Sequence, residues 1–347
     1  MAAAASRSAA VLARIDAELA SLDTADAVFA NALHIADANL RHFFPSLDAA
    51  QTHALIRGLL HHQRMSALDQ NDFDMLRDAH ITSECGDLPW RADAPKIFCT
   101  YHFGSYKFLF QALGARGVDC LLFVSGRTLE RQADDFLAAS VRARKACGWR
   151  GTLDILDAEK KHSVLQGLRA LKRGTPLVLY VDGNTGTGSG DDHLLPVTFF
   201  GKTLSARSGI AYLSHAAGAP IVPVTCLRRP DASLHLRFHA AIAPGSAGRE
   251  AYLADAMQRV YDVLAAVLAD DLAQWEGWLY VHRHLAKASL DAVDADATVS
   301  AADAEARVRG DDRYALLRFP GLRILLDKAR FTCTLVEDPG DGKASRT

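Results

Sequence analysis

His102 is the side chain of this sequence best placed for chemistry. It directly follows a short apolar run, residues 95–101, and precedes Phe103-Gly104-Ser105, where the glycine lets backbone or substrate approach closely. A neutral imidazole at such a position can take a proton from a hydroxyl or an amine as that group attacks a thioester. A purely structural histidine is the alternative.

The segments around His102 alternate between strand-like and helix-like patterns. Apolar runs rich in β-formers predict strands at residues 95–101, 120–125, 152–156, 175–181 and 220–227. Three- and four-residue spacing predicts helices after Ser105 through Leu113 and at residues 129–147, 161–173 and 205–217. This alternation is typical of a sheet with a parallel core covered by helices. Ligands of such sheets bind beyond the carboxyl ends of strands, where both His102 and Asp182 lie.

The flanking segments complete the predicted organisation. Residues 6–68 have helical spacing and predict about three helices before the first strand, one of them capped by Ser46 or Asp48. Residues 234–242 alternate like an exposed or edge strand, and residues 250–272 form a long helical pattern.

The C-terminal part differs in composition from the rest. Residues 286–310, rich in Ala and Asp, predict a linker or a solvated helix, and residues 313–336 predict a small lobe with Pro320-Gly321 as a turn between two short strands. We therefore expect an α/β protein with a mixed, largely parallel sheet flanked by helices. The predicted parts are an N-terminal helical segment (1–94), a core (95–285), and a linker with the small lobe (286–347).

Composition narrows the possible partners. The 347 residues are 49% apolar and 23% charged with a net charge of −2, and the basic residues are spread along the chain, so no face for nucleic acid is expected. The six cysteines are scattered without zinc-ligand spacing, which favours free thiols in the cytoplasm and no metal site. No apolar run reaches the length of a signal peptide or a membrane span, so we expect at most peripheral membrane contact.

Four stretches together resemble a known family in their order and spacing. They are HFGSYK from His102, LRALKRGTPLVLYVDGN, LPVTFFGKTLSARSGIAYLSHAAGAPIVPV and WEGWLYVHRHL. They resemble the lysophospholipid-acyltransferase-like superfamily, most closely the lipid A biosynthesis lauroyl/myristoyl acyltransferases, over roughly residues 39–285. The resemblance implies an α/β fold and transfer of an acyl group from an acyl carrier protein or coenzyme A thioester. It implies neither a metal nor a cofactor in the chemistry.

Position 107 departs from that family. The pattern there is H-x-x-x-x-D/E, whereas this chain has Lys107. A carboxylate would accept the imidazole N–H, fix the tautomer and stabilise the imidazolium, but an ammonium group only donates, and its charge lowers a histidine's pKa. Asp182 is our candidate substitute, because its VDGN stretch resembles the family's third block; a turn-forming Asp-Gly is the alternative. Asp157, Asp191 and Asp192 are further candidates.

Several polar side chains are candidates for substrate binding. Arg127 follows a strand end and Arg207 opens a predicted helix, so either can meet a pantetheine phosphate or an anionic acceptor, although solvated arginines are the alternative. The glycine-rich residues 183–190 can present backbone amides to a phosphate, or serve as a lid or a plain linker. We predict substrate binding by Ser105, Lys107, Arg127, Asn184 and Arg207.

The predicted function is that of a soluble acyltransferase. We expect an acyl or peptidyl group to move from a carrier-protein or coenzyme A thioester to a hydroxyl or amine of a small-molecule or lipid acceptor, with His102 as general base. Lipid A itself is a less favoured acceptor, since no N-terminal membrane anchor is visible. The alternatives are a pseudoenzyme that binds lipid or carrier protein, with Lys107 marking lost catalysis, and a thioesterase that uses water as acceptor.

Overall fold

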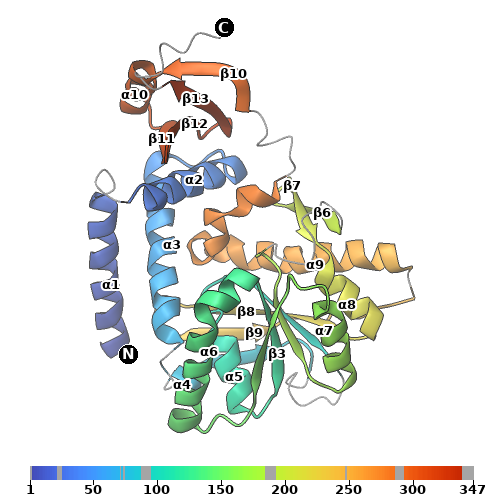
Figure 1. Cartoon of the computed structure of the whole chain (residues 1–347). Coiled ribbons are helices and arrows are strands. Elements are labelled where there is room, and N and C mark those ends of the chain that lie inside the picture. Colours follow the sequence, from blue (N-terminus) through green and yellow to red (C-terminus); the bar gives the residue numbers. More distant parts are fainter. Residues whose placement is uncertain are drawn as a thin grey trace. The chain divides into compact units, whose positions relative to one another are not determined.

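The computed structural model describes residues 2–21, 26–70, 72, 75–86, 95–183, 193–246, 248–285 and 293–337 (Figure 1). These residues form two compact units. Unit 1 comprises Met1–Val11, His61–Phe199 and Thr203–Trp275, and unit 2 comprises Leu12–Leu60, Phe200–Lys202 and Glu276–Thr347. The predicted division at positions 94 and 285 stays a prediction.

A seven-stranded sheet forms the centre of unit 1 (Figure 1). Its strands are β1 (His80–Ser83), β2 (Ile97–Thr100), β3 (Cys120–Val124), β4 (Leu153–Asp157), β5 (Leu177–Tyr180), β8 (Ile221–Arg228) and β9 (Leu234–Phe238). Their order is β1-β9-β8-β2-β5-β3-β4, and among the described strand pairs only β8 and β9 run antiparallel. The prediction of a mixed, largely parallel sheet flanked by helices is therefore confirmed.

Most of the helices overlap the ranges predicted from the apolar spacing. They are α1 (Ala2–Ala20), α2 (Ala27–Phe43), α3 (Ala49–Asp69), α4 (Met75–Asp78), α5 (Phe108–Ala115), α6 (Gly126–Cys147), α7 (Ser163–Lys172), α8 (Gly209–Ala217) and α9 (Arg249–Asp270), followed by the 3-10 turns η2 (Leu272–Gln274), η3 (Glu276–Leu279) and η4 (Val281–His284). The start of α3 is fixed by a capping box. Asp48 Oδ1 accepts from the Gln51 backbone N at 2.8 Å, and Gln51 Oε1 accepts from the Asp48 backbone N at 2.9 Å. The predicted cap at Asp48 is confirmed.

The alternation of side chains along the strands divides the core of unit 1 into two layers. Phe98, Leu122 and Val178 lie at paired positions of neighbouring strands and are buried against the apolar face of α5. On the other face, α7 packs closely because Gly167 has no side chain: a Cβ there would lie 2.8 Å from the Phe123 ring. Both faces of the sheet are thus covered, and the carboxyl ends of its strands remain the place for a site.

One predicted helix in unit 1 was wrong in its first turn. Residues 205–217 do not form one helix, because β6 (Leu194–Phe199) and β7 (Lys202–Arg207) form a hairpin and α8 begins only at Gly209. Phe200 and Gly201 at its turn both have positive φ, 46° and 73°, as a tight hairpin turn requires. Arg207 therefore ends a strand and does not open a helix.

The segment predicted as an edge strand has neighbours on both sides. β9 ends at Phe238, and it lies between β8 and the short strand β1, which pairs with it in parallel from His80 to Ser83. Strand β1 was not predicted because its four residues, HITS, are mostly polar and too short to show an alternating pattern.

Besides α2 and parts of α1 and α3, unit 2 contains a four-stranded sheet and the helix α10. The elements are β10 (Val293–Ser300), α10 (Ala301–Gly310), β11 (Tyr314–Phe319), β12 (Leu322–Asp327) and β13 (Thr332–Glu337), with the strand order β10-β13-β12-β11. Residues 286–310 were expected to be a linker or a solvated helix. α10 is such a helix, with Ala304 as its one buried residue, whereas β10 is a strand that pairs with β13. The lobe also has three strands after α10 where two were expected, because β13 pairs with β12.

Within the described ranges, no helix is both long and apolar enough to cross a membrane.

Candidate active site

His102 and Asp182 lie side by side beyond the carboxyl ends of two neighbouring strands. β2 and β5 pair in parallel, with Thr100 opposite Tyr180, so the residues that follow them meet at one edge of the sheet. His102 Nδ1 lies 2.9 Å from Asp182 Oδ1, and the His102 backbone N donates to Asp182 Oδ2 at 2.9 Å. The two residues that the sequence placed at strand ends are therefore in direct contact.

Asp182 is held as a buried carboxylate. Its exposed fraction is 2%, and Trp275 Nε1 donates to Oδ2 at 2.7 Å as a third hydrogen bond. Burial alone would raise its pKa, but the charge of His102 and the hydrogen bonds from His102 and Trp275 hold the pKa of Asp182 below its usual value. An ionised carboxylate only accepts, so the His102 hydrogen is on Nδ1 and the lone pair of the neutral ring is on Nε2.

Two tyrosines enclose the imidazole. The Tyr180 ring stacks on His102 with centroids 4.7 Å apart, and Tyr106 meets it edge-on at 5.1 Å. The side chain of His102 is nevertheless 26% exposed, so a substrate group can reach it. Lys107 Nζ lies 5.9 Å from the centre of the Tyr106 ring, and the residue occupies the cap position of α5. The ammonium of Lys107 thus contacts an aromatic face, as cations commonly do.

The turn after His102 is fixed by its backbone. Gly104 has φ of 58°, and a Cβ there would lie 2.1 Å from the carbonyl oxygen of Cys226 and 2.9 Å from Gln274 Oε1. The Gly104 N–H donates to the carbonyl of Gln274 at 2.8 Å, and the Ser105 N–H donates to that of Cys226 at 2.9 Å. With the His102 N–H bonded to Asp182, these three amides are committed within the protein. Glycine is required at 104 by this close approach.

A buried charged cluster binds the side chain of Ser105 in the same turn. Ser105 Oγ donates to Asp69 and accepts from Arg228 Nη2 at 2.8 Å, and Arg228 also forms an ion pair with Asp69. All three side chains are buried, with exposed fractions of at most 5%. Ser105 therefore holds the turn in place, and direct contact between Ser105 and a substrate stays a prediction.

Three residues of this site were not predicted from the sequence: Asp69, Arg228 and Trp275. Charged residues are mostly exposed, so nothing in the patterns marks Asp69 and Arg228 as a buried pair. Trp275 begins the WEGWLYVHRHL stretch that carried the family resemblance, and that was the available signal. Its indole N–H could be assigned to Asp182 only once the geometry was known.

The remaining predicted site residues lie in different places. Arg127 is exposed in the first turn of α6, and Arg207 is half-buried at the end of β7. Asp157 ends β4, two strands away from β5, where its Oδ1 accepts from the Glu159 backbone N at 2.9 Å. Asn184, Asp191 and Asp192 lie outside the described residues.

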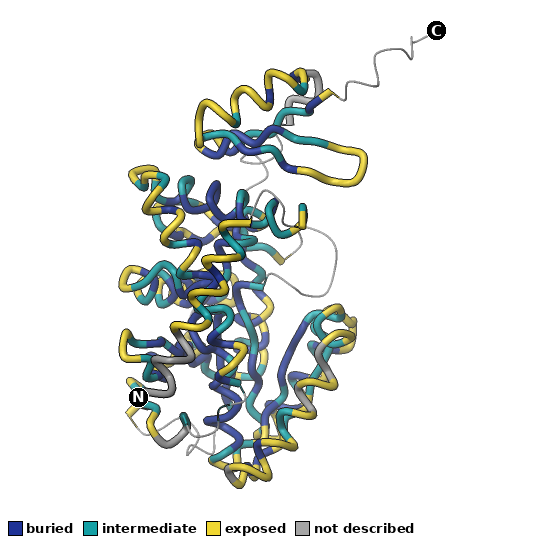
Figure 2. The backbone as a smooth tube through the Cα atoms, turned by 90° about the vertical axis from the view of Figure 1, so that its left-hand side faces the viewer, coloured by how far each residue is buried: buried dark blue, intermediate teal, exposed yellow. Residues whose placement is uncertain are grey.

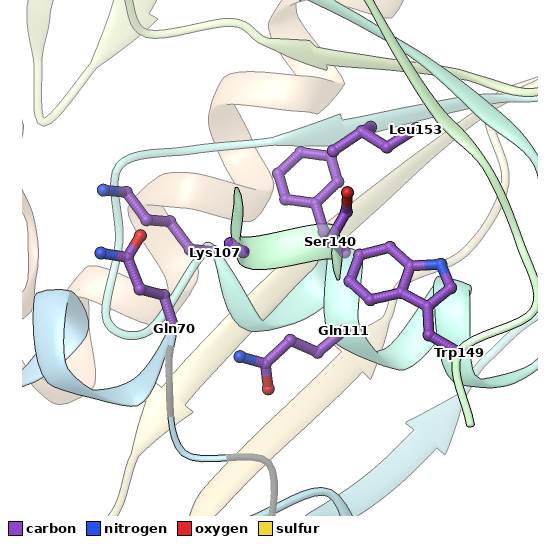
Figure 3. A pocket seen from close by; sticks show the side chains of 8 residues that line it. Gln70, Lys107, Gln111, Ser140, Trp149 and Leu153 are labelled. Carbon is purple, nitrogen blue, oxygen red and sulfur yellow. The ribbon is translucent and has the colours of Figure 1, made fainter. Parts of the chain in front are cut away.

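A small pocket lies beside Lys107 (Figure 3). It has a volume of about 30 Å³, and its lining is mostly apolar. In Figure 3, Lys107 and Gln70 lie on one side of it and Trp149 on the other. The lining residues are Gln70, Lys107, Phe110, Gln111, Ala139, Ser140, Trp149 and Leu153. A small apolar group fits there, with a cation at its edge.

Among the residues that the structure describes, no group of three or more His, Cys, Asp or Glu side chains is arranged to hold a metal ion.

Comparison with known proteins gives the family relation. Residues 152–286 match the sequence model of a family described as bacterial lipid A biosynthesis acyltransferase. The chain is related to acyltransferases. The match covers Asp182, the β6–β7 hairpin, α9 and Trp275, whereas His102 and Lys107 precede it. It supports an acyltransferase as the enzyme class of this chain.

The curated proteins and the solved structures give two further comparisons with this chain. No curated protein matched its sequence. Among solved structures, a match is the 1-acyl-sn-glycerophosphate (LPA) acyltransferase PlsC from Thermotoga maritima, with 15% sequence identity and a TM-score of 0.34. That match covers 69% of this chain and 88% of the other.

Proposed function

We propose that the chain transfers an acyl or peptidyl group from a carrier-protein or coenzyme A thioester to a hydroxyl or amine, with His102 as general base. The observation that carries the proposal is the hydrogen bond between His102 and Asp182, because it supplies the carboxylate that position 107 lacks. The family match supports the reaction class. The pathway that we favour is one that makes a specialised metabolite or a lipid.

The proposed step uses the two nitrogens of His102 differently. Nε2 takes the proton from the acceptor as the acceptor's oxygen or nitrogen forms a bond to the thioester carbonyl carbon. Asp182, 2.9 Å from Nδ1, stabilises the imidazolium that this transfer creates. When the tetrahedral intermediate collapses, the C–S bond breaks and the imidazolium returns its proton to the departing thiolate.

The oxyanion of that intermediate needs donors from outside the turn. The N–H groups of His102, Gly104 and Ser105 donate within the protein, so they are not available to a substrate oxygen. We propose that Lys107, Arg127, Asn184 and Arg207 supply the binding contacts, to the oxyanion or to anionic groups of donor and acceptor.

A reducing compartment fits the thiols of the chain. Cys85, Cys99, Cys120, Cys226 and Cys333 are free. Burial raises the pKa of Cys120 to about 12, so this thiol stays protonated and unreactive. We propose on this basis that the protein works in the cytoplasm, where acyl carrier protein and coenzyme A thioesters are made.

The proposal is tested by replacing His102 with Ala and measuring acyl transfer from a panel of acyl-coenzyme A and acyl-carrier-protein thioesters. Transfer should fall by about 10³-fold, within the range that general-base catalysis contributes. His162→Ala, an exposed histidine at the start of α7, serves as the matched control and should keep full activity. Unchanged turnover in the His102 variant would remove this residue from the mechanism.

Native mass spectrometry of the wild-type protein with acylated carrier protein separates the proposal from its alternatives. Appearance of the acylated acceptor supports transfer. Release of free acid at the same rate with and without acceptor indicates a thioesterase, and a stable complex with the intact donor indicates a pseudoenzyme. The intact His102–Asp182 pair favours the first outcome over the last.

A further inference from the structure

The tip of the β11–β12 hairpin in unit 2 exposes two large apolar side chains. Phe319 is 43% exposed and Leu322 is 42% exposed, and the two are Cα partners at the last position of the ladder. Pro320 and Gly321 form the turn between them, and Gly321 adopts φ of 69°. Figure 2 shows this tip in the colour of exposed residues, next to strand segments coloured as buried and intermediate. The apex of the hairpin is therefore apolar and solvated.

Basic residues lie directly behind that apex. Arg318 and Arg323 face each other across the ladder, one position below the apolar pair. Arg318 is exposed and Arg323 half-buried. The sequence from 313 to 326 contains three arginines and no acidic residue. Arg313 lies at the other end of the ladder and is bound to Asp327, so the arginines nearest the tip are Arg318 and Arg323.

Two hydrogen bonds attach the hairpin backbone at Arg318 to α2. The side chain of Asn31 on α2 donates to the carbonyl of Arg318 at 2.7 Å and accepts from its N–H at 3.0 Å. Val28, one helical turn before Asn31, adds a third exposed apolar side chain in this region. An apolar apex on a fixed backbone loses little conformational entropy when it is buried by a partner.

We propose that this tip, residues 318–323, inserts into the surface of an anionic lipid bilayer. The order of chemical groups along the hairpin, an apolar apex followed by cations, matches the order in a bilayer, where acyl chains lie beneath anionic headgroups. An acidic carrier protein would match the arginines but leaves the apolar apex without a counterpart. The proposal stands independently of the acyltransferase function.

The test is co-sedimentation of the full chain with vesicles of phosphatidylcholine, alone or mixed with phosphatidylglycerol. The wild-type protein should sediment with the anionic vesicles, and more weakly with neutral ones. The double variant Phe319→Ser/Leu322→Ser should bind roughly tenfold more weakly, because the inserted apolar area is lost. Arg318→Gln should weaken binding about fivefold, and only to anionic vesicles.

Leu165→Ser is the matched control, since Leu165 is a similarly exposed leucine on α7 in unit 1. It should bind like wild type. A second readout is Phe319→Trp, whose additional emission should shift to shorter wavelength with anionic vesicles and be quenched by brominated lipid, whereas Leu165→Trp should show neither change. Because all these positions are exposed, circular dichroism of each variant should match the wild type.

Two results overturn the proposal. One is a wild-type protein that does not bind vesicles of either composition. The other is a double variant that binds anionic vesicles as tightly as wild type. Loss of carrier-protein binding in the double variant, with no vesicle binding by wild type, would assign the tip to a protein partner.

Discussion

Two histidines of unit 1, the proposed general base His102 and His235, differ in the partners that their rings have. His102 has a buried carboxylate at its Nδ1, 2.9 Å away. His235 on β9 has a hydroxyl partner instead, with its Nε2 2.7 Å from Thr82 Oγ1. Burial, followed by the charges of Arg229 and neighbouring groups, lowers the pKa of His235 to about 4. An imidazole in those surroundings stays neutral, whereas one beside a carboxylate can take up a proton during a reaction.

The largest expected effect comes from removing the carboxylate that sets His102 apart. Asp182→Asn should lower kcat by about 10³-fold, because the amide cannot stabilise an imidazolium and can leave the wrong tautomer. The amide oxygen still accepts from Trp275, so the fold should persist. Asp157→Asn, at the end of β4, is the control and should change kcat little. Both variants would be compared under saturating donor. An Asp182→Asn enzyme whose kcat lies within threefold of the wild-type value contradicts the proposed role of the His102–Asp182 pair.

The same variant gives a pH-dependent stability change of known sign. The pKa of Asp182 is lowered in the folded state, so its carboxylate stabilises the fold above the unfolded pKa and that stabilisation is lost as pH falls through the folded value. The Tm difference between wild type and Asp182→Asn should therefore be largest near neutral pH and shrink on acidification. A difference that is constant with pH would mean that Asp182 is not held as a carboxylate.

A smaller effect is expected from the indole that positions Asp182. Trp275→Phe removes one hydrogen bond to a charged group and keeps most of the ring's packing, so kcat should fall about tenfold. Because Nε1 no longer donates, the pKa of Asp182 should rise and the acid limb of the pH–rate profile should move to higher pH. Trp278→Phe, another buried tryptophan, serves as control: it should leave that limb unchanged whatever it does to stability. An unmoved acid limb in Trp275→Phe would reduce Trp275 to a packing role.

The sequence predicted the strand ends of this site but not their neighbourhood. Apolar runs placed His102 and Asp182 directly after strands, and ligands of parallel sheets bind beyond such strand ends. Which strands are adjacent depends on long-range packing, which local patterns do not encode, so contact between the two residues had to come from the fold. The buried ion pair of Asp69 and Arg228 was invisible for the same reason, since each residue alone has the pattern of a surface charge.

The errors in secondary structure have physical causes of their own. β7 was taken into the following helix because Ser205 and Ala206 suit either state, and only the turn at Phe200-Gly201 makes a hairpin of the segment. β10 lies in a stretch with few large side chains, and it is a strand because β13 offers it a ladder. In both cases tertiary pairing decided between states that local propensity left nearly equal.

Replacing His235 tests the other side of the comparison, because this histidine is expected to take no part in the reaction. His235→Gln should leave kcat unchanged, since Gln can still bond to Thr82 and His235 lies on β9, two strands away from β2. Its folded pKa lies below the unfolded value, so protonation favours unfolding and wild type loses stability as pH falls from about 6.5 to 4. The variant should avoid about 1 kcal/mol of that loss, allowing for solvent screening at a half-buried ring. Denaturant unfolding at pH 7 and pH 4.5 measures it, and equal losses in both proteins would contradict the assignment.

A small change in kcat is expected at position 107, where the family that the sequence resembles has an acid. Lys107→Glu should leave kcat within about threefold, because Asp182 already occupies the Nδ1 side of His102 and Lys107 contacts the Tyr106 ring. If Lys107 binds an anionic donor or acceptor, KM should rise several-fold, and Lys107→Gln should show a weaker version of the same rise. Steady-state kinetics with each substrate varied in turn separates the two parameters. A kcat raised more than tenfold would instead mean that a carboxylate at 107 orients the histidine better than Asp182 does, and that Lys107 marks partial loss of catalysis.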